Sequence, residues 1–251
     1  MSAEAVRVPS AGAIFWTEAA RDGSGASTAL GGAPAMDVTL TTPVPAGTQV
    51  ALGSRGLAVL LRPIAYDHAP TPAELGVPLG IPPLTIAGVV RTVDGRFHPR
   101  RFRETLSPAT PNYVPLRRSL QATTVGEAGA VILTLRWDTG APASWSVVLL
   151  SCVRNGVTLG FCGQADRHGD VIIPLTALPP LAPGQGNDSM IVRVNADFAQ
   201  AGADAADPDA LAAASFSTGA GFASQHSVTI VRGTITKGRD LGFAAVTLQS
   251  H

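Results

Sequence analysis

The chain has 251 residues, of which 45% are hydrophobic and 14% are charged, and its 18 basic residues balance its 18 acidic ones. A typical soluble domain carries about 25% charged residues, so this surface is unusually neutral. That composition argues against a basic nucleic-acid binder and against a charge-rich disordered chain, and apolar runs are interrupted before the roughly 18 residues that a membrane span needs.

The predicted elements are almost all β-strands, rich in Val, Ile, Leu and Thr and separated by Gly, Pro, Asn or Asp. Helical signals are short, at 17–20, 71–75 and 207–214, and no alternation of strands and helices occurs, which argues against a parallel α/β fold. Several strands alternate apolar and polar residues, as antiparallel sandwiches do. In chain order the predicted strands cover 38–42, 48–52, 57–65, 84–93, 130–137, 144–153, 157–165, 170–175, 190–197, 226–236 and 241–249.

Two long stretches without strand signal, 94–129 and 176–189, separate these clusters. Loops of this length in a compact domain are usually functional or lie across another surface. We expect 94–120 and 176–189 to be arms that contact neighbouring subunits.

The two cysteines flank a predicted hairpin whose turn is the Asn-Gly pair at 155–156. In that register Cys152 lies opposite Leu159 and Cys162 opposite Leu149, so the thiols point to opposite faces and a disulfide is disfavoured. We expect free, buried cysteines in a reducing compartment. The N-terminus shows no apolar signal-peptide core. We therefore expect a cytoplasmic protein, or one that joins a virion-like particle assembled in the cytoplasm.

Arginines form the densest charged feature, between positions 91 and 118. With aromatic residues among them they resemble a polyanion-binding strip, but planar guanidinium groups also suit ion pairs at protein interfaces. The acidic partner in that case is a neighbouring subunit or the Asp-rich segment 197–209 of the same chain. We predict a protein interface made by Arg91, Arg96, Arg100, Arg101, Arg103, Arg117 and Arg118.

No catalytic signature occurs, so we assign no catalytic, cofactor-binding or metal-binding residue and expect no enzyme. An active site assembled from distant loops would have to bring together Asp67, His68, His168 and Asp170. The segment 166–170 also has the residues of a cation site, but Asp followed three residues later by Gly is what a tight β-turn needs. We expect a turn there.

The middle of the chain carries a recognisable pattern. A strand at 130–137 leads into Asp138, Gly140 and Pro142, then a strand at 147–150, a hairpin, and a second turn within 165–172. This pattern resembles the carboxypeptidase regulatory-like domain, which implies a transthyretin-like β-sandwich fold and says little about activity.

A looser resemblance takes in more of the chain: the strand at 84–90, the arm at 93–102, the sandwich and the Leu-Pro-Pro-Leu loop at 178–181. Together these segments are similar to accessory structural proteins of phage-tail-like contractile injection systems. The resemblance implies a protein that works by assembling.

The predicted fold is an all-β, transthyretin-like or immunoglobulin-like sandwich with flanking β segments and long loops. We expect three parts: a β-rich domain at 1–124 that includes the arm, the sandwich at 125–197, and a C-terminal linker and hairpin at 198–251 that completes the N-terminal sheet. The predicted function is a non-enzymatic structural or adaptor subunit of a phage-tail-like particle. Its partners are subunits of that assembly, copies of itself included, with no nucleic acid and no cofactor.

The alternative function is a module that binds carbohydrate or a cell surface. In that case exposed aromatic rings would stack against sugars. The candidates are Trp16, Tyr113 and Trp145.

Overall fold

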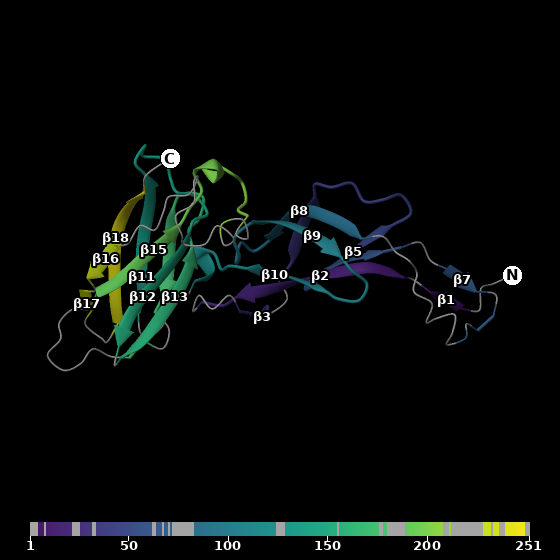
Figure 1. Cartoon of the computed structure of the whole chain (residues 1–251), viewed down its shortest axis with the longest axis horizontal. Helices are drawn as coiled ribbons and strands as arrows, with labels where there is room; N and C mark the ends of the chain where they lie inside the picture. The colour runs from purple at the N-terminus through teal and green to yellow at the C-terminus, as the bar shows by residue number, and fades with distance from the viewer. Residues whose placement is uncertain are drawn as a thin grey trace.

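The computed structural model describes residues 5–7, 9–21, 26–31, 34–61, 64–66, 68–69, 71, 83–123, 129–154, 156–175, 178–179, 189–207, 211, 228–231, 233–235 and 239–248, with backbone only at 5–7, 64–66, 189 and 228–248. Nearly all regular elements in these ranges are β-strands, which confirms the all-β prediction. Figure 1 shows two β-structured bodies placed end to end, here called the N-terminal and C-terminal sandwiches.

The N-terminal sandwich consists of two sheets. In the first, the order is β10-β2-β6-β5 with β3 beside β2, and β10 pairs with β2 in parallel; in the second, the order is β4-β8-β9. Trp16 of the first sheet meets Phe102 of the second edge to face in the core, with ring centroids 5.5 Å apart. The strands are β2 (Ser10–Ala19), β3 (Ser27–Ala29), β4 (Met36–Leu40), β5 (Gln49–Gly53), β6 (Gly56–Leu60), β8 (Leu84–Thr92), β9 (Arg100–Leu106) and β10 (Asn112–Leu116).

The C-terminal sandwich packs the sheet β14-β11-β18-β17 against the sheet β13-β12-β15-β16. Its core is largely aliphatic, with Leu133, Leu135, Leu150 and Ile173 fully buried. The strands are β11 (Gly129–Trp137), β12 (Val147–Arg154), β13 (Val157–Gln164), β14 (Asp170–Pro174), β15 (Ser189–Asn195), β16 (Val228–Val231), β17 (Gly233–Ile235) and β18 (Arg239–Leu248).

We expected the C-terminal strands to complete the N-terminal sheet, and this prediction is wrong. β18 runs parallel to β11 along its whole length, from Gly129 opposite Asp240 to Trp137 opposite Leu248, and β16 pairs with β15. The physical reason is that β11 and β15 each have one open edge, and each edge gains a hydrogen-bonded neighbour in this way.

Three short elements complete the fold. β1 (Ala5–Arg7) and β7 (Ile64–Tyr66) pair antiparallel, at the end of the molecule remote from the C-terminal sandwich (Figure 1). Two 3₁₀ turns, η1 (Leu120–Ala122) and η2 (Phe198–Gln200), lie near the boundary between the sandwiches. Among the described residues, none of the helices has the length and apolar character needed to cross a bilayer.

The predicted arm at 94–120 is wrong, because this stretch contains β9, β10 and η1. Along β9 the side chains alternate between inside and outside: Phe102 and Leu106 are buried, whereas Arg101 and Arg103 are exposed. Arginine occupies the outward positions where Thr or Val is usual, so the period-2 pattern is hidden by charge. The helical turn predicted at 17–20 is likewise wrong, since residues 17–19 belong to β2.

The second predicted arm, 176–189, lies mostly outside the described residues. Its described part contacts this chain: Leu178 is buried in the C-terminal core, and the carbonyl of Pro179 accepts a hydrogen bond of 3.2 Å from Arg154.

The hairpin prediction is confirmed. β12 and β13 pair antiparallel with Arg154 opposite Val157, Cys152 opposite Leu159 and Cys162 opposite Leu149. Neither cysteine forms a disulfide, and both are buried. The turn residue Gly156 has a φ of 75°, which glycine adopts without strain.

Candidate functional site: an arginine-rich junction between the sandwiches

The seven arginines of the predicted interface lie in four different environments. One pairs locally, because Arg96 binds the carboxylate of Asp94 two residues earlier. Two are half-buried where the sandwiches meet, and one, Arg100, is 3% exposed inside the N-terminal sandwich. The other three lie on the outer side of the sheet β4-β8-β9. The two at the junction are Arg117 and Arg118, and the three on the outer side are Arg91, Arg101 and Arg103.

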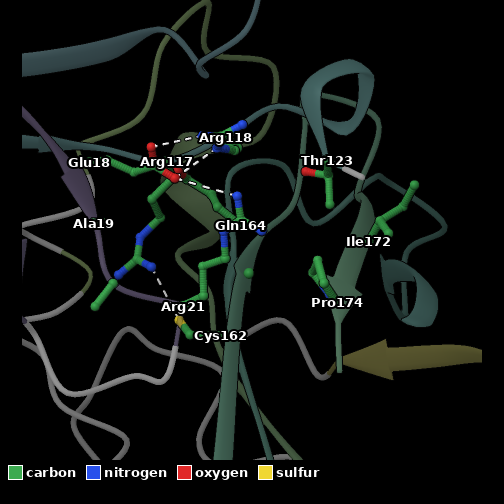
Figure 2. Close-up of a pocket in the computed structure, with 12 residues that line it drawn as sticks. Glu18, Ala19, Arg21, Arg117, Arg118, Thr123, Cys162, Gln164, Ile172 and Pro174 are labelled. Atoms are coloured by element: carbon green, nitrogen blue, oxygen red, sulfur yellow. Dashed lines mark hydrogen bonds and ion pairs between the residues drawn. The ribbon is translucent and has the colours of Figure 1, made fainter. Parts of the chain in front are cut away.

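The junction is centred on Glu18, at the end of β2. Its carboxylate accepts two hydrogen bonds from Arg118, of 2.7 Å from Nε and 3.0 Å from Nη2, and a longer one of 3.5 Å from Arg21. Figure 2 shows these side chains converging from segments far apart in the sequence. Arg118 also lies over the ring of Phe97, 5.9 Å from its centroid.

The electrostatics of this group favour the charged forms. Burial raises the pKa of Glu18, but the hydrogen bonds and charges of Arg118 and Arg21 outweigh it and hold that pKa below its usual value. The hydrogen bond to Glu18 raises the pKa of Arg118 against the opposing effect of burial. A two-pronged pair of this kind fixes orientation as well as distance.

The Glu18 pair lies within the N-terminal sandwich. Two contacts beside it join that sandwich to the C-terminal one. The guanidinium of Arg117 donates to Sγ of Cys162 at 3.2 Å, and the backbone N–H of Cys162 donates to the carbonyl of Arg21 at 2.6 Å. The space that these residues leave has a volume of about 30 Å³, which holds about one water molecule. This part of the junction therefore acts as a clamp and not as a ligand site.

The acidic segment 197–209 lies partly along the arginine-bearing strand. The N–H of Arg101 donates to the carbonyl of Ala206 at 2.7 Å, and the N–H of Ala206 to the carbonyl of Pro99 at 3.3 Å. The segment thus adds main-chain hydrogen bonds between the sandwiches. The acidic segment therefore contacts the start of β9 in the same chain. From the sequence, this segment and a neighbouring subunit were the two alternatives for a partner of the arginines.

A cleft of about 470 Å³ opens on another side of the junction. His98 from the N-terminal sandwich and Trp145 from the C-terminal sandwich line it, with rings edge to face and centroids 5.8 Å apart. Trp145 has a φ of 61°, a strained conformation for a bulky residue. Its indole N–H donates to the carbonyl of Ala203 at 2.7 Å, which holds the ring in place.

His98 is the most perturbed titratable group described. It is 5% exposed, and burial lowers its pKa to about 4, with the charge of Arg117 acting in the same direction. Asp166 and a hydrogen bond with the backbone of Gln164 oppose that shift. The imidazole is therefore neutral at neutral pH, and the side chain packs in the junction against Trp145.

The residues proposed for a distant-loop active site are not brought together. Asp67 lies outside the described residues, and His68 follows β7, at the far end of the molecule from the C-terminal sandwich (Figure 1). His168 and Asp170 belong to the turn before β14. There Asp166 accepts from the N–H groups of His168 at 2.7 Å and Asp170 at 3.1 Å, which are turn-capping bonds.

The turn prediction at 166–170 is thus confirmed. Gly169 has a φ of 82°, and a Cβ there would lie 2.2 Å from the carbonyl oxygen of Leu135. Within the part of the chain that the structure describes, no three His, Cys, Asp or Glu side chains are grouped as metal ligands are.

Two of the three aromatic residues named for sugar stacking are buried. Trp16 is 2% and Trp145 is 3% exposed, so neither presents a ring face to solvent. Tyr113 is 60% exposed, and beside it lies Phe15, which is 41% exposed and was not predicted. Sequence reasoning also missed Glu18 and His98. Alternation along 10–19 would have placed Phe15 outside, but nothing local marks the other two.

Comparisons with known proteins leave the family open. No family model and no curated protein matches this chain. Among solved structures it is similar to BcpA, the major pilin subunit of Bacillus cereus, with 9% identity over 86% of this chain and 55% of that chain and a TM-score of 0.25. It is similar to a streptococcal ancillary pilin with 13% identity over 81% of this chain and 50% of that chain, also with a TM-score of 0.25.

A third match is an endo-fucoidan hydrolase from glycoside hydrolase family 107, with 8% identity over 84% of this chain and 24% of that chain and a TM-score of 0.15. The chain spans about half the length of the two pilin chains. With TM-scores this low, none of the three matches bears on function. Neither of the families suggested by the sequence is matched.

Proposed function

We propose that this protein is a non-enzymatic structural or adaptor subunit of a large assembly. The observation that supports this most is the division of its arginines. Arg117 joins the two sandwiches through Cys162, and Arg118 pairs with Glu18 within the N-terminal sandwich, while Arg91, Arg101 and Arg103 form an outward basic face on the sheet β4-β8-β9.

The geometry of this basic face suits contact with another protein. Arg101 and Arg103 lie two residues apart on β9, directly opposite Val89 and Ala87 of β8, and Arg91 follows Val89 on the same side. Asp37 lies opposite Arg91 on β4 and places one acidic side chain at the margin of the basic face. A small basic face on a chain of zero net charge fits an acidic protein surface better than a nucleic acid, whose backbone needs a larger basic excess.

A second surface supports association. The edge strand β5 is exposed at all five of its residues, and Val50 and Leu52 are 37% and 47% exposed. An exposed edge strand with apolar side chains is a template for pairing with another chain. A copy of this protein or a different subunit of the same particle would satisfy it.

The assembly we propose is a phage-tail-like contractile injection particle, put together in the cytoplasm. The turn at Asp138 supports the related proposal of a carboxypeptidase regulatory-like sandwich at 125–197: Gly140 has a φ of 84°, and its N–H donates to the carbonyl of Trp137 at 2.9 Å. The boundaries near 124 and 198 stay part of this proposal.

Gradient sedimentation of native lysate, followed by electron microscopy of the heavy fractions, tests it. We expect the protein to sediment with particles that carry sheath and tube. Recovery of the chain solely as a soluble monomer would overturn the proposal.

A paired variant sharpens that experiment. Arg101→Glu with Arg103→Glu reverses the basic face and is expected to move the protein into the light fractions. Arg136→Glu, an equally exposed position on the C-terminal sandwich, is the matched control. Equal loss from the particle in both variants would mean that the basic face is not the contact.

A further inference from the structure

A second surface of the N-terminal sandwich has the features of a ligand site. It is a groove of about 550 Å³ on the outer side of the sheet β10-β2-β6-β5, within the size range of small-molecule sites, roughly 300–1,000 Å³. Phe15 and Tyr113 form one side, Arg55 lies at the turn between β5 and β6, and 27–30 closes the other side.

The two aromatic rings are held by strand pairing. Phe15 of β2 and Tyr113 of β10 are register partners, so both project from the same face. Their rings are 5.9 Å apart at an interplanar angle of 29°, and both are largely exposed. Large apolar side chains left together in water on a single face are uncommon and mark contact sites.

The frame around the rings is rigid. The N–H of Trp16 donates to the carbonyl of Arg55 at 2.9 Å, which ties the β5–β6 turn to β2. Gly56 beside it lies so close that a Cβ would be 2.2 Å from the carbonyl oxygen of Ile14. A site built on such fixed strands needs little ordering when a ligand binds.

Polar groups of the right kind surround the rings. Ser27 and Thr28 are exposed and line the groove together with Arg55. Thr17 lies on the same side of β2 as Phe15 and is 7% exposed, and its hydroxyl has no hydrogen-bond partner among the described residues. Because this hydroxyl is itself buried, it lies beneath the surface of the groove, and Ser27, Thr28 and Arg55 supply the polar groups that a ligand can reach.

We propose that this groove binds carbohydrate, with a pyranose ring stacked on Tyr113 and Phe15. A sugar has an apolar C–H face and a rim of hydroxyls, which matches ring surfaces bordered by hydroxyl and guanidinium groups. None of the described residues that line the groove is acidic, so they offer a cationic ligand no counter-charge, whereas Arg55 can bind a sugar hydroxyl or carboxylate.

The site is independent of the proposed assembly contact. The sheets of the N-terminal sandwich face each other across the core, so the groove and the basic face with Arg101 and Arg103 lie on opposite outer sides. A subunit built into a particle through the basic face would still present the groove on the other side, whereas pairing through β5 would bring a neighbour to the sheet that carries the groove.

The test uses the full chain on an array of oligosaccharides of glucose, galactose, N-acetylglucosamine and glucuronic acid, with the bound sugar then titrated by calorimetry. We expect Tyr113→Ala and Phe15→Ala to weaken binding about ten-fold or more, since each removes a stacking surface. Tyr113→Phe keeps the ring and is expected to retain most of the affinity.

Phe198→Ala is the matched control, because Phe198 is 40% exposed and lies on the other sandwich. Circular dichroism of each variant distinguishes lost binding from lost folding. No binding to any sugar on the array, equal loss in the Phe198 control, or binding of a proline-rich peptide in place of sugar would overturn the proposal, whatever the sedimentation result.

Discussion

The two sandwiches share a two-layer plan but differ in what their side chains do. In the C-terminal sandwich the strands bury aliphatic side chains such as Leu135 and Ile173 completely. In the N-terminal sandwich the core contains an aromatic contact, and aromatic, arginine and edge-strand residues face outward. Both cores bury aliphatic side chains completely, Ile14 and Ile86 in the N-terminal one included. The sandwiches therefore differ most in their outer faces, where the N-terminal one carries the paired rings of Phe15 and Tyr113 and the exposed arginines of β9.

The largest effect is expected in the C-terminal core. Leu135→Ala removes a fully buried side chain and leaves a cavity, so the free energy of unfolding should fall by about 3 kcal/mol. Leu52→Ala, on the exposed strand β5 of the other sandwich, should change it by less than about 0.5 kcal/mol. Urea denaturation measures the free energy of unfolding of both variants, and similar losses in the two would contradict the difference between the buried and the exposed position.

The next effect concerns pH and the contact between the sandwiches. The folded pKa of His98 is about 4, below the 6.5 of the free side chain. Between these values the unfolded chain binds the extra proton, so stability is full above pH 6.5 and falls by up to about 3 kcal/mol as the pH drops to 4. Asp166 and Arg117 act on the imidazole with opposite signs and set the size of the effect.

His98→Phe supplies the control for this pH dependence. It keeps an aromatic ring against Trp145 and removes the titrating group. Urea denaturation of both proteins from pH 7 to pH 4 isolates the contribution of the histidine to the free energy of unfolding, since the carboxylates titrate equally in each protein. A wild-type curve that runs parallel to that of the variant would contradict the assignment.

A smaller loss is expected from the part of the clamp that orients the N-terminal side, the pair of Glu18 and Arg118 within the N-terminal sandwich. Glu18→Gln removes the charge that Arg118 binds at 2.7 Å, and we expect about 1–2 kcal/mol of destabilisation at pH 7. Because the folded pKa of Glu18 is lowered, this contribution is present above the usual carboxyl pKa and is lost as the pH falls through the folded value.

Asp94→Asn is the comparison for this clamp. It breaks a similarly close pair with Arg96, but both of those side chains are 41% exposed, and solvent screens an exposed pair so that it stabilises the fold little. Calorimetry should show a lower and broader transition for Glu18→Gln alone. An equal shift in both variants would mean that burial does not strengthen the clamp.

The same division explains what could be predicted from the sequence. In the C-terminal sandwich, alternation and the Asn-Gly turn were enough to place Cys152 opposite Leu159, because local turn chemistry sets hairpin register. In the N-terminal sandwich β2 and β9 were missed. Arginine, glycine and alanine fill positions where a strand usually has β-branched residues, so the intrinsic strand propensity of these segments is low. Tertiary packing makes them strands nevertheless.

The candidate site was less accessible to sequence reasoning than the fold. The cluster of arginines at 91–118 could be recognised in the sequence. The pairing of Arg118 with Glu18, 100 positions earlier, could not be predicted from it. His98 is a lone histidine in sequence, and only the arrival of Trp145 from the other sandwich makes it a junction residue. Such pairs depend on tertiary contacts that carry no local pattern.

The smallest expected effect on stability is at the outward arginines. Arg101→Ala removes an exposed side chain from β9 and should change the free energy of unfolding by less than about 0.5 kcal/mol. Arg100→Ala, one residue earlier, removes a side chain that is 3% exposed and donates to the carbonyl of Pro115. It should cost about 1–3 kcal/mol. Because strand side chains alternate between faces, a cost at Arg101 equal to that at Arg100 would mean that the basic face is part of the fold and not a surface kept for a partner.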